Sequence, residues 1–240
     1  MTARIPNHLL AALPAADYAE IAHDLHPVIV CMGQVVQHPH QPVKTIWFPV
    51  DCLMSLRAVN ESGAALEIAQ AGNDSVIGLM GMGMGNVGTK NEPGLIAVVE
   101  IGGSAMQIDV VILKKILAHS FALQTVLYDA LRDLMLQASR NALCTHYHFV
   151  EPRVARALLR MRDRMHMNKF QMTQGFLAQA LGVRRAGVTK AASALQLQGL
   201  IRYSRGAITI LDGAGLERAA CACYATDRRL QTSSRQKLSE

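Results

Sequence analysis

The region that most constrains the fold lies between residues 173 and 203, where two short apolar helical patterns flank a glycine. Thr173 is suited to cap the first helix, because its hydroxyl can accept a hydrogen bond from a free backbone N–H. Gly182 can adopt the left-handed conformation that a tight turn requires. The inner face of the first helix comprises Phe176, Leu177, Ala180 and Leu181, and that of the second comprises Val188, Ala192 and Leu195. The sequence therefore predicts a helix, a turn and a second helix.

Two short β-prone runs follow this pair of helices. The runs "LIRY" and "AITIL" are separated by "SRG", which is suited to a hairpin turn with Arg205 at its tip. A helix pair followed by such a hairpin is typical of a winged helix-turn-helix, whose second helix enters the major groove of DNA.

Positive charge is concentrated on the second helix and on the hairpin. If the apolar face that contains Val188 is buried, Arg185 and Thr189 face outward together, because residues four apart share a helix face. Arginine is the commonest reader of guanine edges. The predicted DNA contacts are Thr173, Arg184, Arg185, Thr189, Lys190 and Arg205. Two other interpretations stay open, a solvated basic face and a cradle for an acidic small molecule.

The net charge of +6 is unevenly distributed along the chain. Residues 1–149 hold 8 Lys/Arg against 12 Asp/Glu, whereas residues 150–240 hold 16 against 6. This division is expected when a polyanion-binding module is joined to a mildly acidic one, since Lys and Arg release counterions that are condensed on phosphates. A solubilising surface would explain the charge equally well.

The N-terminal half has the character of an antiparallel β-structure. Turn-forming residues separate short β-prone runs at 28–36, 43–48, 52–59, 65–70, 95–101 and 104–108. Many short strands at such spacing predict a barrel or jelly roll. Apolar residues between Leu9 and Leu25 follow helical spacing, which predicts a helix before the barrel.

A long helix is predicted from about Phe121 to Leu143. Its apolar stripe consists of Leu123, Leu127, Leu131, Leu134 and Ala138. These intervals are close to those of a helix that packs on another helix. We interpret the stripe as a dimer seam, because a long helix between two domains has little of its own domain to cover it. The alternative is a helix that lies on its own barrel.

The order of barrel, long helix and winged helix, with "TQGFLAQALGVRRAGVTKAASALQLQGLI" and "ITILD" near its end, resembles the Crp/Fnr superfamily of bacterial transcription regulators. The resemblance extends from about Asn7 to Tyr224. It implies an α+β fold with an N-terminal antiparallel jelly-roll sensor barrel of the cyclic-nucleotide-binding type, a homodimer formed by the long helix, and a palindromic DNA site. It also implies that Arg185 reads a base, that Lys190 is the second basic contact, and that RNA polymerase is a further partner.

Several positions depart from the pattern of the superfamily. Ala186 stands where the family usually has a glutamate that can accept a hydrogen bond from cytosine, so the commonest half-sites are not assumed. Leu79 stands in place of the glutamate that holds the ribose of cyclic AMP, and Pro93 and Gly94 replace the Arg-Ser pair that neutralises its phosphate. We therefore expect no cyclic-nucleotide binding, because an unpaired phosphate in an apolar barrel would be costly.

Two other sensory groups of the superfamily need different ligands. The first thirty residues contain no cysteine, so the N-terminal iron–sulfur centre of oxygen-sensing members is not expected. Haem sensing stays open, because one or two of the nine histidines would suffice as ligands. The alternative function is therefore a haem- or small-ligand sensor whose DNA binding depends on that ligand.

The remaining motifs are not predicted to carry chemistry. The run "GMGNVG" at residues 83–88 matches a dinucleotide-binding pattern, but "NEPG" follows where its helix should run. The pairs His38/His40 and His146/His148 are two apart, so surface or hinge positions are expected. Cys221 and Cys223 lie on one predicted helix and should point to different faces, which would prevent joint chelation. We predict no metal site, no cofactor and no enzymatic activity, since no nucleophile, base and orienting group occur together.

These observations divide the chain into four parts. The predicted parts are a sensor barrel over residues 1–120, a dimerisation helix over 121–146, a winged helix-turn-helix over 147–226 and a disordered polar tail over 227–240. The odd cysteine count, the lack of a secretory leader and the lack of a membrane-length apolar run predict a cytoplasmic protein.

Overall fold

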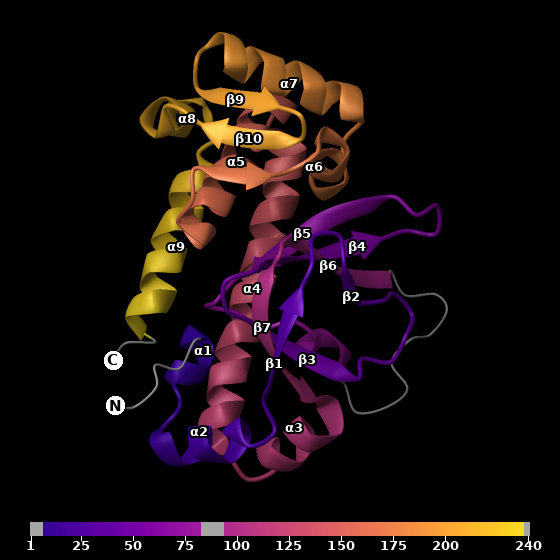
Figure 1. Ribbon diagram of the computed structural model, residues 1–240, viewed down its shortest axis with the longest axis vertical. Coiled ribbons are helices and arrows are strands. Elements are labelled where there is room, and N and C mark those ends of the chain that lie inside the picture. The colour runs from indigo at the N-terminus through magenta and orange to yellow at the C-terminus, as the bar shows by residue number, and fades with distance from the viewer. Residues whose placement is uncertain (1–6, 83–93, 238–240) are drawn as a thin grey trace.

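The structure is a computed structural model that describes residues 7–82 and 94–237. A β-barrel domain occupies one end and a smaller mixed domain the other, and the long helix α4 (Phe121–Tyr147) runs beside both (Figure 1). Twenty-seven residues of α-helix extend over about 40 Å, which is enough to reach from one domain into the other.

Two short helices precede the barrel where the sequence predicted a single helix. These are α1 (His8–Ala11) and α2 (Ala15–Ala22). The Asn7 side chain accepts a hydrogen bond from the backbone N–H of Leu9 at 3.0 Å, which caps α1. Pro14 separates the two helices, since proline lacks an N–H and starts a helix more readily than it continues one.

The barrel consists of two antiparallel sheets, which confirms the predicted jelly-roll architecture. The first sheet has the order β1 (His26–Val30), β7 (Gly103–Asp109), β3 (Thr45–Pro49). The second has the order β2 (Val35–Gln37), β6 (Gly94–Ile101), β4 (Leu53–Val59), β5 (Ala65–Ala71). The single run predicted at 28–36 forms two strands, because Gly33 adopts a φ of +83° and turns the chain. The short helix η1 (Leu79–Gly81) follows β5, and α3 (Val110–Leu117) follows β7.

The apolar stripe of α4 packs on its own domain, so its assignment to a dimer seam is wrong. Leu123, Leu127 and Leu134 have only 1%, 6% and 3% of their surface exposed. The first two belong to the core that contains Ile46 and Phe48, and Leu134 belongs to the core between the sheets. The interpretation failed because α4 lies along the barrel, next to β5, and is therefore covered by its own domain.

The C-terminal domain begins with α5 (Val150–Met165) and ends with the small helix α8 (Gly213–Ala219) and the longer α9 (Cys223–Lys237). Between them lie β8 (Lys169–Gln171), α6 (Gln174–Leu181), α7 (Arg185–Leu197), β9 (Ile201–Ser204) and β10 (Ala207–Ile210). The three strands form an antiparallel sheet in the order β8-β10-β9. One apolar core unites the sheet with α5, α6 and α7.

Helix α9 occupies much of the segment for which we predicted a disordered tail. It runs beside α4 in Figure 1, and Asp227 on it is 11% exposed. The Asp227 carboxylate accepts hydrogen bonds from Nε of Arg140 at 3.0 Å and from Nε of Arg156 at 2.6 Å. These two arginines order the start of a segment that has little apolar surface of its own.

Within the described ranges, no single helix has the length and apolar character needed to cross a membrane, and only α3 and α4 taken together, with a bend of 119° between them, reach that threshold.

Candidate nucleic-acid interface

Local hydrogen bonds set the geometry of the helix pair α6–α7. The Thr173 hydroxyl accepts a hydrogen bond from the backbone N–H of Phe176 at 3.1 Å, as expected of an N-cap. Gly182 ends α6 with a φ of +62°. A side chain there would also lie 2.8 Å from the Leu66 side chain of β5, so the turn is fitted against the barrel. The turn before α7 therefore lies directly against β5 of the barrel.

Helix α7 buries one face and exposes the other. Its buried residues are Val188, Ala191, Ala192 and Leu195. Arg185, Thr189 and Lys190 are exposed, as is Ala186. The Thr189 hydroxyl donates a hydrogen bond to Oε1 of Gln174 at 2.6 Å, which ties the exposed face of α7 to the start of α6. The first turns of α7 thus present basic and small polar side chains to solvent.

The hairpin β9–β10 places Arg205 at an exposed tip. Arg205 has a φ of 49° and Gly206 a φ of 79°, and two consecutive positive values are what a tight two-residue hairpin turn requires. The carbonyl oxygen of Gly206 accepts a hydrogen bond from the backbone N–H of Met172 at 2.7 Å. This bond fixes the wing tip beside Thr173, at the side of the domain where α6 and α7 meet (Figure 1).

Arg185 is also close to the wing. Burial raises the pKa of the Tyr203 hydroxyl on β9, while the positive charge of Arg185 acts in the opposite direction. The Tyr203 hydroxyl itself donates a hydrogen bond to the carbonyl oxygen of Met172 at 2.9 Å. Helix α7 also packs against β9, so the exposed residues of the helix and the wing are neighbours. We call them the α7–wing surface and define it by Arg184, Arg185, Thr189, Lys190, Arg205 and Thr173.

The cations of the α7–wing surface are available to an external partner. Among the described residues, no carboxylate lies within ion-pairing distance of Arg184, Arg185, Lys190 or Arg205. Helices α6 and α7 contain no acidic residue. Because no carboxylate in the described part of the chain offsets these charges, the surface is suited to a polyanion.

Much of the remaining positive charge of the C-terminal region has an internal partner, which its sequence did not reveal. Arg160 on α5 is 8% exposed and donates to Glu67 on β5 at 3.1 Å and to Gln137 on α4 at 3.1 Å. Arg164 donates to Asp74 at 2.7 Å. These contacts join α5 of the C-terminal domain to the barrel, across 93 and 90 residues of sequence.

A second ion pair lies in the barrel next to Glu67. Arg57 and Glu100 are both buried, with 3.3 Å between Nη2 and the carboxylate. Burial, and then the neighbouring Glu67 carboxylate, raise the pKa of Glu100 to about 8. The guanidinium of Arg57 also stacks on the Phe176 ring of α6 at 4.3 Å. The barrel thus holds the helix that precedes the turn.

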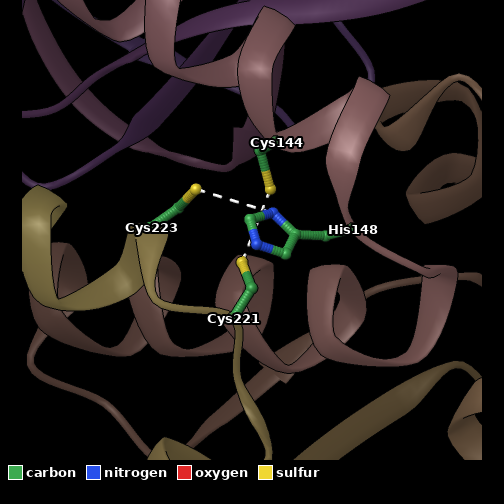
Figure 2. A group of neighbouring side chains, drawn as sticks. All are labelled: Cys144, His148, Cys221 and Cys223. Atoms are coloured by element: carbon green, nitrogen blue, oxygen red, sulfur yellow. Dashed lines mark hydrogen bonds between the residues drawn. The ribbon is translucent and has the colours of Figure 1, made fainter.

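The structure corrects our expectation for Cys221 and Cys223. Cys221 lies in the break between α8 and α9, not on a common helix with Cys223, so the two side chains can converge. Both point toward Cys144 and His148 at the end of α4 (Figure 2). A hydrogen bond from the Cys221 thiol, aided by the positive charge of Arg156, lowers the pKa of Cys144 to about 5. Sequence spacing could not show this cluster, because Cys144 and Cys221 are 77 residues apart.

The positions that depart from the cyclic-nucleotide pattern lie in apolar or crowded surroundings. Leu79 is partly buried against the apolar core beneath α4. A side chain at Gly94 would lie 2.5 Å from Cβ of Pro39, which leaves no space for one there. Pro93 and the "GMGNVG" run lie outside the described residues.

The comparisons with known proteins agree with this architecture. The sequence model of the Crp-like helix-turn-helix domain matches residues 152–219. A search of curated proteins gave no match.

Solved structures resemble the chain over most of its length. A protein described as a Crp/Fnr-family transcriptional regulator from Eubacterium rectale is 19% identical with a TM-score of 0.70, over 88% of this chain and 96% of that chain. A Crp/Fnr-family regulator from Thermus thermophilus is 23% identical with a TM-score of 0.66, over 81% and 98%. FixK2 from Bradyrhizobium japonicum is 17% identical with a TM-score of 0.66, over 82% and 98%. The chain therefore has the fold of the Crp/Fnr family of transcriptional regulators, and residues 152–219 form its Crp-like helix-turn-helix domain.

Proposed function

We propose that this protein is a sequence-specific transcription regulator that binds a palindromic DNA site as a homodimer. The observation that carries the proposal is the α7–wing surface, where Arg184 at the N-cap of α7, Arg185 and Lys190 on α7, and Arg205 on the wing are exposed and, among the described residues, pair with no carboxylate. A helix of this size fits the major groove, and a wing beside it lies near the phosphate backbone.

The roles of the basic residues follow from their positions. Arg185 and Thr189 are one turn apart on the exposed face of α7 and are suited to reach base edges. Arg184 at the start of the helix and Arg205 at the wing tip are suited to contact phosphates, and Lys190 can take either role. Thr173 lies beside the wing tip, and its hydroxyl, which caps α6, is suited to donate a hydrogen bond to a phosphate as well.

DNA selection with the purified protein tests this proposal. We expect a palindrome whose half-sites are about one helical turn, roughly 34 Å, apart. The logarithm of the affinity should fall linearly with the logarithm of the salt concentration, with a slope of about −0.9 for each phosphate contacted. Recovery of no preferred sequence, together with binding that does not depend on salt, would contradict the proposal.

An exposed face of α4, opposite in character to its buried leucine stripe, supports the homodimer. Phe121, Tyr128 and Met135 are 80%, 70% and 63% exposed and recur every seven residues. This is the repeat with which helices pair along a common seam. Leu131 and Ala138 of the original stripe are partly buried and lie between the two faces. We place the partner helix on the face of Tyr128 and Met135.

An aspartate on this face should prevent dimer formation. We expect Met135→Asp to raise the dissociation constant of the dimer at least about tenfold, because an unpaired carboxylate would be buried at the seam. Sedimentation velocity at micromolar concentration measures the change. Leu197→Asp is the control, since Leu197 is 90% exposed at the end of α7 and away from the seam. A wild-type protein that sediments as a monomer would rule out the dimer and leave the DNA-binding surface intact.

A further inference from the structure

Four potential metal ligands converge where α4 ends and α9 begins. The Sγ atoms of Cys144 and Cys221 are 3.5 Å apart, and Sγ of Cys223 is 3.7 Å from Nδ1 of His148. All four ligand atoms lie within 4.8 Å of one another. In Figure 2 the three sulfur atoms lie around the imidazole ring of His148.

The Cys144–Cys221 and Cys223–His148 separations are close to the edges of a small tetrahedron. With zinc–sulfur bonds of about 2.3 Å and a zinc–nitrogen bond of about 2.0 Å, tetrahedral geometry requires sulfur–sulfur edges of about 3.8 Å and sulfur–nitrogen edges of about 3.5 Å. Three thiolates and one imidazole form one of the usual ligand sets of structural zinc. We propose that Cys144, His148, Cys221 and Cys223 bind one tetrahedral divalent metal ion of the zinc type.

The backbone presents the ligands as two closely spaced pairs. Cys144 and His148 are four residues apart at the end of α4, where the backbone N–H of His148 still donates to the carbonyl oxygen of Cys144 at 3.1 Å. They therefore lie one helical turn apart. Cys221 and Cys223 flank a single residue in the turn that starts α9. Two short-range pairs brought together from distant segments are typical of structural zinc sites.

The surroundings of the cluster suit a metal–thiolate centre. Cys144 and Cys221 are 2% and 7% exposed, while His148 and Cys223 are partly exposed, which leaves a path for a metal ion. Three thiolates and a divalent ion have a net charge of −1, and Arg153 and Arg156 line the same small cavity as Cys144. These cations offset that charge. The tight spacing excludes a multinuclear iron–sulfur cluster, whose irons and bridging sulfides would need to separate the ligands further.

The cluster lies between α4 and α9, so a bound ion would have a structural role that is separate from DNA binding. One pair of ligands belongs to the helix that lies along the barrel, and the other belongs to the C-terminal segment of the winged domain. A bound ion would therefore fasten α9 to α4 and hold the winged domain at a fixed angle to the barrel. Metal binding itself does not depend on the proposed function.

Cobalt(II) is the direct probe of this site. The fully reduced, full-length protein should bind one Co²⁺ per chain and develop intense visible ligand-field bands with thiolate charge-transfer absorption in the near ultraviolet, as tetrahedral thiolate coordination requires. Addition of one equivalent of Zn²⁺ should abolish these bands. The weak spectrum of an octahedral ion, or no binding to the reduced protein, would overturn the proposal.

Single substitutions assign the ligands. His148→Ala and Cys223→Ser change partly exposed residues, and each should lower Zn²⁺ affinity at least about tenfold in competition with a chromophoric chelator, while Cys144→Ser should remove the cobalt spectrum. Cys31→Ser is the matched control, because Cys31 is exposed and outside the cluster. Equal affinity in all of these variants would also refute the site.

Two further outcomes separate this proposal from its competitors. A Cys144–Cys221 disulfide in protein purified without reductant, combined with no metal uptake after reduction, would show that the cluster is a thiol pair and overturn the metal site. Stoichiometric metal binding by a protein that selects no DNA sequence would support the metal site and refute only the proposed function.

Discussion

Replacing Arg160 with methionine should lower the free energy of unfolding by about 3–5 kcal/mol. The guanidinium donates to Glu67 at 3.1 Å and to Gln137 at 3.1 Å, and both Arg160 and Glu67 are less than a tenth exposed. The substitution leaves the Glu67 carboxylate buried without its cation, and an uncompensated buried charge is strongly destabilising. Urea denaturation followed by circular dichroism measures the change.

Two further variants test the cause of this loss. Arg132→Met should change stability by less than about 1 kcal/mol, because Arg132 is 45% exposed and pairs with Asp129 at the surface. Glu67→Gln combined with Arg160→Met should be less destabilising than the two single substitutions added together, since the double variant removes both charges. If the single and double effects add without coupling, the Arg160–Glu67 pair does not act as we describe.

Replacing Arg185 with alanine should weaken binding to the selected DNA site by about 1–3 kcal/mol, a loss of roughly five- to 150-fold. The side chain is exposed on the first turn of α7, one turn before Thr189, and has no carboxylate partner among the described residues. Its forked guanidinium can donate to O6 and N7 of one guanine. The preference for one base in each half-site should therefore relax.

The specificity profile distinguishes a base contact from a phosphate contact. Competition against every single-base variant of the site provides this profile. Arg205→Ala is the matched control, and it should weaken all sequences about equally and reduce the salt slope by about one unit. If a folded Arg185→Ala protein has an unaltered specificity profile, Arg185 does not read a base, and the exposed face of α7 is an ordinary solvated surface.

The winged domain could be predicted because its signals are local. Thr173 and Phe176 are three residues apart, and the inner face of α7 repeats within a few residues. The turns are also local, because the positive φ of Gly182 and of Gly206 depends only on the residue and its immediate neighbours. Short-range steric and hydrogen-bonding preferences thus suffice to place these elements.

The apolar stripe of α4 depends on tertiary packing as well as on local pattern. The spacing of Leu123, Leu127 and Leu134 correctly indicates a helix with one buried face. It does not indicate which surface covers that face, because burial against a barrel and burial against a second chain require the same apolar pattern. Tyr128 and Met135 are exposed because α4 packs along β5 with its other face, and this orientation is a property of the tertiary structure.

By itself, the sequence determined the periodic elements, the charge division and the outward position of Arg185, since each depends on residues within a few turns of one another. Only the tertiary structure decided the partners of the buried charges and of the cysteines. Arg160 meets Glu67 across 93 residues and Cys144 meets Cys221 across 77. Such pairs depend on how the barrel, α4 and α9 pack, because the energy of a charge or a thiol is set by the neighbours that folding brings within a few ångströms.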